Sequence, residues 1–251
     1  MELKAIGHIQ SCFKDKFGTP RQPGLVPLSK AILKIDSCWQ PELSLQGLQD
    51  FQFVWLIWGF HKNTSTRYHP KVHPPRYHGK TMGVFATRSP HRPNPLGLSV
   101  VQLLSVDLQQ GIVHFGGIDL VDGTPIYDIK PYLPAVEALP RARVGWVSQA
   151  SQSQFLFQWA QQALISLQDW ADFRQQDAEE LRDLIQQTLQ LDPRPLVYRG
   201  YEGEQNAPYR SQHAVRLWEA DIHFSMSSAE TIQIMQIKWG EEAPASSSGK
   251  D

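Results

Sequence analysis

The stretch GVFATRSPHRPNPLGLSVV, residues 83–101, places a proline-rich loop between two apolar segments. Val84, Phe85 and Thr87 before the loop are strand formers, and residues 98–106 after it resume a β-like pattern. Each proline of the loop holds φ near about −65° and restricts the residue before it. We therefore expect strands at 84–87 and 98–106, joined by a stiff loop that loses little conformational entropy when it binds a ligand.

Short apolar runs bounded by Gly, Pro and Asn recur on both sides of this stretch. They predict further strands at 1–10, 31–35, 53–60, 112–120 and 125–129, with a short helical turn around 43–48 and a long irregular loop at 63–80. Many strands at close spacing favour a barrel or a rolled sheet over βαβ units. The predicted fold class is mainly β.

The pattern changes near residue 149. Apolar residues at helical spacing predict helices at 154–168 and 172–190, and alternation predicts strands at 214–224 and 232–239. The final residues, EEAPASSSGKD, hold too little apolar surface to offset the entropy of ordering. The predicted organisation is a mainly β domain, a barrel or a rolled sheet, at 1–148, a small α+β domain at 149–240 and a disordered tail at 241–251.

The composition is that of a soluble globular protein, with 41% hydrophobic and 20% charged residues among 251. The longest apolar run, FVWLIWGF at 53–60, is far shorter than the roughly 20 residues of a membrane-spanning helix. The N-terminus lacks the apolar core of a secretory signal, so we expect a cytoplasmic protein. Cys12 and Cys38 are then expected to stay reduced.

Charge is unevenly distributed, although the net charge is only −1. Residues 51–106 contain no Asp or Glu. Their cations and aromatic side chains are Lys62, Arg67, Lys71, Arg76, Lys80, Arg88, Arg92, Trp55, Trp58, Tyr68, Tyr77 and Phe85, among others. Such a segment suits RNA, through phosphate contacts and base stacking. The alternative is an ordinary solvated surface.

Familiar catalytic motifs are missing. No G-x-G-x-x-G or G-x-x-x-x-G-K-[ST] string occurs, which disfavours dinucleotide-type and P-loop architectures. His61, His69, His73 and His78 have neither an H-E-x-x-H pattern nor a nearby carboxylate in sequence, so we expect no metal site. The turn DLVDGTP at 119–125 is either a plain hairpin or a place where carboxylates meet a ligand.

The strings ATRSPHRPNPLGLS at 86–99 and DLVDGTPIYDIKPYLP at 119–134 resemble the TsaA-like family of bacterial and archaeal tRNA methyltransferases. PRQPG at 20–24, the Phe60-His61 pair and DPRP at 192–195 extend the resemblance over nearly the whole chain. It implies a homodimeric, S-adenosylmethionine-dependent enzyme built on a single-sheeted β-barrel. The implied reaction methylates N6 of threonylcarbamoyladenosine at position 37 of tRNA, with threonine tRNA as the expected acceptor. An S-adenosylmethionine-sensing RNA-binding module and a metal-dependent hydrolase remain as alternatives.

Matched motif by motif, the resemblance implies a cofactor pocket. Its residues are Pro20, Arg21, Gln22, His61, Lys62, Arg88, Leu98, Asp119, Leu120, Val121 and Asp122. Lys62 departs from the neutral glutamine expected after that histidine.

Two further sets of residues complete the predicted site. Asp122 and Asp128 are the candidates for accepting the N6 proton. The expected tRNA contacts are Lys71, Arg76, Arg92, Arg194, Tyr198 and Arg199.

Overall fold

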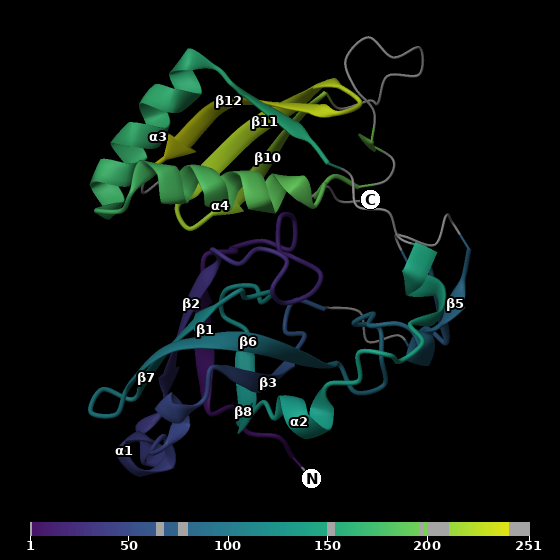
Figure 1. Ribbon diagram of the computed structural model, residues 1–251, viewed down its shortest axis with the longest axis vertical. Coiled ribbons are helices and arrows are strands. Elements are labelled where there is room, and N and C mark those ends of the chain that lie inside the picture. Colours follow the sequence, from purple (N-terminus) through teal and green to yellow (C-terminus); the bar gives the residue numbers. More distant parts are fainter. Residues whose placement is uncertain are drawn as a thin grey trace. The chain divides into compact units, whose positions relative to one another are not determined.

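The structure is a computed structural model that describes residues 2–63, 68–74, 80–149, 154–195, 198–199 and 211–240. The chain divides into two compact units (Figure 1). The first comprises Met1–Cys12 and Pro20–Gln152, and the second Phe13–Thr19 and Ser153–Asp251. The expected boundary after residue 148 lies close to the observed division, but the assignment of residues 13–19 to the second unit had no signal in the sequence. The expected tail at 241–251 lies outside the described residues.

The first unit is a closed barrel, which confirms the mainly β fold class. Its strands follow the order β1-β2-β7-β6-β3-β8, and β8 returns to β1. Every pairing is antiparallel. The strands are β1 (Gly7–Ser11), β2 (Lys30–Ile35), β3 (Phe53–Gly59), β6 (Leu96–Asp107), β7 (Ile112–Gly116) and β8 (Pro125–Pro131).

Alternation along the strands builds the barrel core. Burial follows a period of two in β1, so that Ile9 points inward together with Leu33, Phe115 and Ile126 from other strands. Strand β3 is apolar along nearly its whole length. Its inward side chains are buried, and on its outer face Trp55 packs edge-on against Tyr132 at 5.8 Å between ring centroids.

Short elements decorate the barrel. They are η1 (Ser37–Trp39), α1 (Pro41–Ser44), η2 (Leu48–Asp50), β4 (Lys71–Val72), β5 (Met82–Gly83), η3 (Val84–Ala86), α2 (Pro134–Glu137) and η4 (Gly145–Gln149). The strand expected at 84–87 is wrong, because these residues form the 3-10 turn η3. The N–H and the hydroxyl of Thr87 both donate to the carbonyl of Val84, at 3.1 and 2.8 Å, which closes the turn.

The second unit is a four-stranded sheet with two helices. Its strand order is β10-β11-β12-β9. The elements are β9 (Leu156–Trp159), α3 (Gln161–Arg174), α4 (Ala178–Gln190), β10 (Gln212–Leu217), β11 (Ala220–Ser228) and β12 (Thr231–Trp239). Helix α3 packs against β12 and α4, and Figure 1 shows both helices running across the sheet. The buried side chains of Trp170 and Ile185 belong to these helices.

Three expected elements in this unit have wrong boundaries. The helix expected at 172–190 begins at Ala178, since residues 172–174 belong to α3, and the other two differ more. The helix expected at 154–168 begins only at Gln161, because residues 156–159 pair in parallel with residues 231–234 of β12. The strand expected at 214–224 is two strands, because the chain reverses at Trp218 and Glu219 so that Leu217 pairs with Ala220. The apolar pattern at 156–159 fits a helix or a strand, and the pattern at 214–224 fits one strand or two. The pairing between strands decides both cases.

The segment Phe13–Thr19 follows β1 yet packs within the second unit. Phe13 is fully buried and forms an isolated antiparallel bridge with Leu217. Gly18 has φ +93°, and a Cβ there would lie 3.1 Å from Val215. Within the described residues, no helix is long and apolar enough to cross a membrane.

Candidate functional site

The predicted cofactor residues come from four segments of the barrel unit. They are the β1–β2 connection, the segment after β3, the loop leading into β6, and the β7–β8 turn. The second and third segments lie side by side, since Gly59 pairs with Leu96 and the N–H of Phe60 donates to the carbonyl of Pro95 at 2.9 Å. The hydrogen bonds below bring all four segments together, which local sequence could not show.

The β1–β2 connection is joined to the proline-rich loop by two predicted residues. Arg88 is exposed and its guanidinium donates to the side-chain oxygen of Gln22. The amide nitrogen of Gln22 donates in turn to the carbonyl of Arg21, at 2.5 Å. A cation and an amide held this way offer donors to a carboxylate-bearing ligand.

Side-chain hydrogen bonds to backbone carbonyls stabilise the proline-rich loop, which the sequence predicts to be stiff. Arg92 donates to the carbonyls of Val84 and Thr87, at 3.3 and 2.7 Å, and Asn63 donates to the carbonyl of Pro90 at 3.2 Å. The guanidinium of Arg92 therefore stabilises the loop, and this leaves it fewer donors for phosphate.

A chain of hydrogen bonds runs from the barrel interior to Asp119. Trp58 Nε1 donates to Ser99 Oγ at 3.0 Å, and Ser99 Oγ donates to Asp119 Oδ1 at 2.7 Å. Trp58 is itself held by its neighbours, since its ring lies 4.4 Å from that of Phe60 and against Gly97. The carboxylate of Asp119 is thus oriented by two residues outside the predicted set.

Ser99 and Trp58 were missed as functional residues, although the sequence carries a signal for both. Ser99 shares the inward face of β6 with Val101 and Leu103, and it is buried. A polar side chain at an inward position of a barrel strand must find a partner. The same reasoning applies to the indole N–H of Trp58 among the inward residues of β3.

Burial shifts the pKa of Asp119. Desolvation raises the pKa of this carboxyl group from its ordinary value of 3.8 to about 6. The bond from Ser99, its own backbone N–H and the charge of Arg88 each lower the pKa, but they do not offset burial. Perturbed carboxyl groups of this kind are concentrated at functional sites.

The β7–β8 turn is tied to the neighbouring strand. Asp122 Oδ1 accepts the N–H of Ser11 at 2.8 Å, and the N–H of Gly123 donates to the carbonyl of Ile9 at 2.8 Å. His61 Nδ1 lies 3.3 Å from the hydroxyl of Thr124. The turn therefore brings His61 and the 119–122 segment to the same end of the barrel.

The two candidate proton acceptors already have structural partners. Asp122 accepts the backbone bond just described, whereas Asp128 accepts the N–H of Ile129 at 2.9 Å and pairs with Lys130 at 3.0 Å. Among the other predicted cofactor residues, Pro20 and Leu120 are buried and Leu98 is exposed. Lys62 and Val121 are half-buried.

The residues expected to contact tRNA fall into different environments. Lys71 is exposed on β4. Arg194 is 5% exposed and donates to both carboxylate oxygens of Asp192, at 2.8 and 3.1 Å. Arg199 also lies 3.2 Å from Asp192, and the ring of Tyr198 lies 6.5 Å from that of His213. The surroundings of Arg194 favour a role in holding the DPRP turn, and Arg76 lies outside the described residues.

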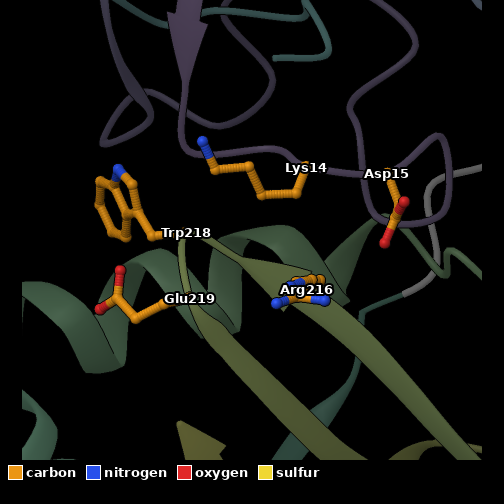
Figure 2. Close-up of a pocket in the computed structure, with 5 residues that line it drawn as sticks. All are labelled: Lys14, Asp15, Arg216, Trp218 and Glu219. Carbon is orange, nitrogen blue, oxygen red and sulfur yellow. The ribbon is translucent and has the colours of Figure 1, made fainter. Parts of the chain in front are cut away.

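The second unit holds a separate pocket of about 470 Å³ (Figure 2). It is lined by Lys14, Asp15, Arg216, Trp218 and Glu219, so it contains no predicted cofactor residue. Trp218 adopts the left-handed backbone region with φ 50°, and Arg174 stacks 3.9 Å from the centroid of its ring. Arg174 also pairs with Glu219 at 2.8 Å. These contacts stabilise a hairpin turn that a bulky residue would otherwise disfavour.

The histidines considered as metal ligands lie partly within the described part of the chain. No group of three or more His, Cys, Asp or Glu side chains gathers there in a way that could hold an ion. The rings of His69 and His91 meet edge to face with centroids 5.3 Å apart. His73 is described but joins no such group, and His78 lies outside the described residues.

Comparison with protein families shows two matching domains. Residues 8–138 match the family described as the tRNA-methyltransferase O N-terminal domain. Residues 152–239 match the family described as the TrmO C-terminal domain. The two matches cover the barrel strands and the second sheet respectively.

Individual relatives extend this similarity over the full length. A putative S-adenosylmethionine-dependent methyltransferase, RcsF, of Pseudomonas aeruginosa is 36% identical, covering 95% of this chain and 98% of that protein. The tRNA (adenine(37)-N6)-methyltransferase of Escherichia coli is 35% identical, covering 91% of this chain and 97% of that protein. The crystal structure of TrmO from Pseudomonas aeruginosa aligns with a TM-score of 0.75 at 33% identity, covering 95% and 98% of the two chains.

Proposed function

The chain belongs to the tRNA-methyltransferase O family, and on that premise we propose that it methylates N6 of threonylcarbamoyladenosine at position 37 of threonine tRNA. The general activity is that of a tRNA (adenine(37)-N6)-methyltransferase, which is the name of the Escherichia coli relative, with S-adenosylmethionine as the methyl donor, as in the name of the RcsF relative. The observation that carries the proposal is the similarity across both units, together with the meeting of the cofactor segments at one end of the barrel.

The residues at this end fit the proposed cofactor. Arg88 and Gln22 supply donors for a carboxylate, and Asp122 supplies an acceptor for hydroxyl or amino groups. S-adenosylmethionine supplies an electrophilic methyl group when it is bound. The chain would contribute mainly alignment of the nucleophile, worth on the order of 7 to 11 kcal/mol in well-oriented systems.

We further propose that tRNA is held by Lys71, Arg76, Arg92, Tyr198 and Arg199. The support is the acid-free character of residues 51–106 and the family match of the second unit. Arg194 acts within this proposal by holding the DPRP turn through Asp192. A tRNA substrate also agrees with the expected cytoplasmic location.

A homodimer is the proposed assembly. The support within this chain is a set of exposed apolar side chains in and on either side of α2, where Leu133 is 48% exposed and Val136 and Leu139 are each 74% exposed. Light scattering at micromolar concentration should give twice the chain mass. A monomeric mass would contradict this proposal and leave the activity open.

The decisive experiment is transfer of labelled methyl from S-adenosylmethionine to bulk tRNA with and without the threonylcarbamoyl group. We expect incorporation only into the modified tRNA, and within it into threonine tRNA. Incorporation into neither preparation would favour an RNA-binding module that senses S-adenosylmethionine. Equal incorporation into both would keep the adenine-N6 activity and remove the threonylcarbamoyl requirement.

Ligand binding offers an independent check. Any ligand of the native state raises the melting temperature by mass action. We expect S-adenosylmethionine and S-adenosylhomocysteine to stabilise the protein and zinc to have no effect. Stabilisation by zinc alone would instead point to the metal-dependent hydrolase.

A further inference from the structure

The segment 119–128 contains three carboxyl groups, those of Asp119, Asp122 and Asp128, and they differ in their hydrogen-bond and ion-pair partners. Asp122 anchors a turn through the N–H of Ser11, and Asp128 is paired with Lys130. The side chain of Asp119 accepts the hydroxyl of Ser99 at Oδ1 and a bond from its own backbone N–H. Its second oxygen, Oδ2, is the position at which a further donor can be accepted.

The bond from Ser99 has a fixed direction. An indole nitrogen can only donate, so Trp58 Nε1 donates its hydrogen bond to Ser99 Oγ, and the Ser99 hydroxyl donates in turn to Asp119 Oδ1. The chain of donors therefore ends on an accepting oxygen of Asp119. This arrangement holds Asp119 as an acceptor and fixes the plane of its carboxyl group.

The position of Asp119 links it to the cofactor segments. Arg88, which bonds Gln22, is the charged residue that acts on Asp119, and Ser99 lies one residue beyond the predicted cofactor residue Leu98. Asp119 thus faces Ser99 from β6 and Arg88 from the proline-rich loop, with its own backbone N–H as a further donor.

We propose that Asp119 accepts the proton that N6 of the adenine loses, and that Ser99 and Trp58 are positioning residues that hold its carboxylate for this step. The proposal rests on the proposed function, since it assumes methyl transfer to an exocyclic amine. It places the proton acceptor at Asp119 and assigns the proton transfer to neither Asp122 nor Asp128.

The step balances as follows. Methyl transfer forms a carbon–nitrogen bond at N6 and breaks the carbon–sulfur bond, whose electron pair stays on sulfur as a neutral thioether. N6 gives up one proton to Asp119 Oδ2, which becomes a carboxylic acid and later releases that proton to solvent. No oxidant, reductant or metal ion is required.

The first test compares Asp119→Asn, Asp122→Asn and Asp128→Asn in the full chain at saturating S-adenosylmethionine and tRNA. Asp107→Asn is the matched control, because Asp107 caps the exposed turn after β6 by accepting the N–H groups of Gln109 and Gln110. A positioned base contributes typically 100- to 10,000-fold, so we expect Asp119→Asn to lower the single-turnover rate by about 100-fold or more. We expect losses below about 10-fold for the other two carboxyl variants and none for the control.

The second test follows the pH profile. Burial places the pKa of Asp119 at about 6, so the rate at limiting substrate should rise with pH through that value in the unmodified protein. Since the Ser99 bond lowers this pKa, Ser99→Ala should move the rise to higher pH, and Ser99→Thr should restore it. A carbon-13 titration of the Asp119 carboxyl group in the free protein should show the same displacement without any turnover.

Several outcomes would overturn the inference. If Asp119→Asn raised only the KM for S-adenosylmethionine, the carboxylate would be a cofactor contact and not the proton acceptor. If Asp128→Asn or Asp122→Asn removed the rise with pH, that residue would be the acceptor. If the unmodified protein methylated no tRNA, the proposed function itself would fail, and the carboxyl titration would still report whether Ser99 tunes Asp119.

Discussion

At the residue scale, the burial that raises the pKa of Asp119 also lowers the stability of the folded protein at neutral pH. Its pKa is raised from 3.8 to about 6 in the folded protein, so the native state holds a proton that the unfolded chain releases. This group therefore favours folding below about pH 3.8, and that contribution is lost as the pH rises through about 6. At neutral pH the ionised carboxylate destabilises the fold, by an amount bounded by about 3 kcal/mol at 1.36 kcal/mol per unit.

Asp119→Asn should accordingly raise the free energy of unfolding at pH 7.5 while it abolishes most activity. Asparagine keeps an oxygen that can accept the Ser99 hydroxyl and removes the buried charge. Urea unfolding at pH 7.5 and pH 4 measures the effect, and the gain should shrink at the lower pH. A variant that is less stable than the original chain at both pH values would show that the carboxylate is needed for structure.

Gly97 allows the Trp58 ring to approach the backbone of β6. A Cβ at this position would lie 2.2 Å from Trp58 Cε2, closer than any packing permits. Gly97→Ala must therefore displace the indole and weaken its bond to Ser99. We expect the free energy of unfolding measured in urea to fall by about 1 to 3 kcal/mol, as for overpacked cores, and the rate of methyl transfer to fall as well. Gly83→Ala is the matched control, because a Cβ there meets nothing within 4 Å.

At the scale of elements, the proline-rich loop combines two arginines with different tasks. Arg92 is committed to the carbonyls of Val84 and Thr87 and lies 5.6 Å from the ring of Phe85. Arg88 is exposed and reaches Gln22 on another segment. The η3 turn, where a strand was expected, is what brings both carbonyls to Arg92, because a strand would point successive carbonyls to opposite sides.

Arg88→Ala should weaken cofactor binding much more than tRNA binding. We expect calorimetry to show at least about a 10-fold rise in the Kd for S-adenosylhomocysteine, because one charge-assisted contact is worth about 1.5 to 3 kcal/mol. The Kd for tRNA should change by less than about 3-fold. Arg92→Ala is the comparison, and it should loosen the loop and affect both ligands. An equal loss of both affinities in Arg88→Ala would make that arginine a phosphate contact.

At the scale of the whole molecule, the two units are not consecutive along the chain. The second unit includes Phe13–Thr19 from the N-terminal region, and Phe13 is fully buried there against Leu217. A division at residue 148 or 152 would therefore separate this segment from its sheet. The barrel is nevertheless closed on itself through β8 and β1.

A fragment of residues 1–152 should fold as a barrel and bind S-adenosylhomocysteine, because every predicted cofactor residue lies within the first unit. It should also expose Phe13 and aggregate, and Phe13→Ser should improve the solubility of the fragment while destabilising the full chain. Light scattering and thermal-shift titration measure these effects. A fragment that loses cofactor affinity would show that the second unit supports the pocket.

The same fragment tests whether the second unit contacts tRNA. Each lost phosphate contact lowers the slope of log affinity against log salt by roughly one unit. A smaller slope for the fragment would support contacts from this unit. An unchanged slope with lost activity would mean that the unit supports the barrel or the dimer.

What the sequence determined by itself is local in origin. A period of two along a strand places Ile9 inside and its neighbours outside whatever the partner strand is, so the mainly β class and most strand positions followed from pattern alone. The pattern left a barrel and a rolled sheet both open, and the resemblance favoured the barrel. The stiffness of the proline-rich loop is likewise a property of its own residues. The cofactor segments were identified only through resemblance, because no pattern in one sequence says which loops meet.

The tertiary structure decided every feature that depends on pairing across the chain. Residues 156–159 form a strand because they pair with β12, and residues 13–19 belong to the second unit because Phe13 forms a bridge with Leu217. The bonds among Trp58, Ser99 and Asp119 span 41 and 20 residues of sequence. Closure of the barrel sets those three side chains at one end of it and buries the carboxylate, and burial is what raises its pKa.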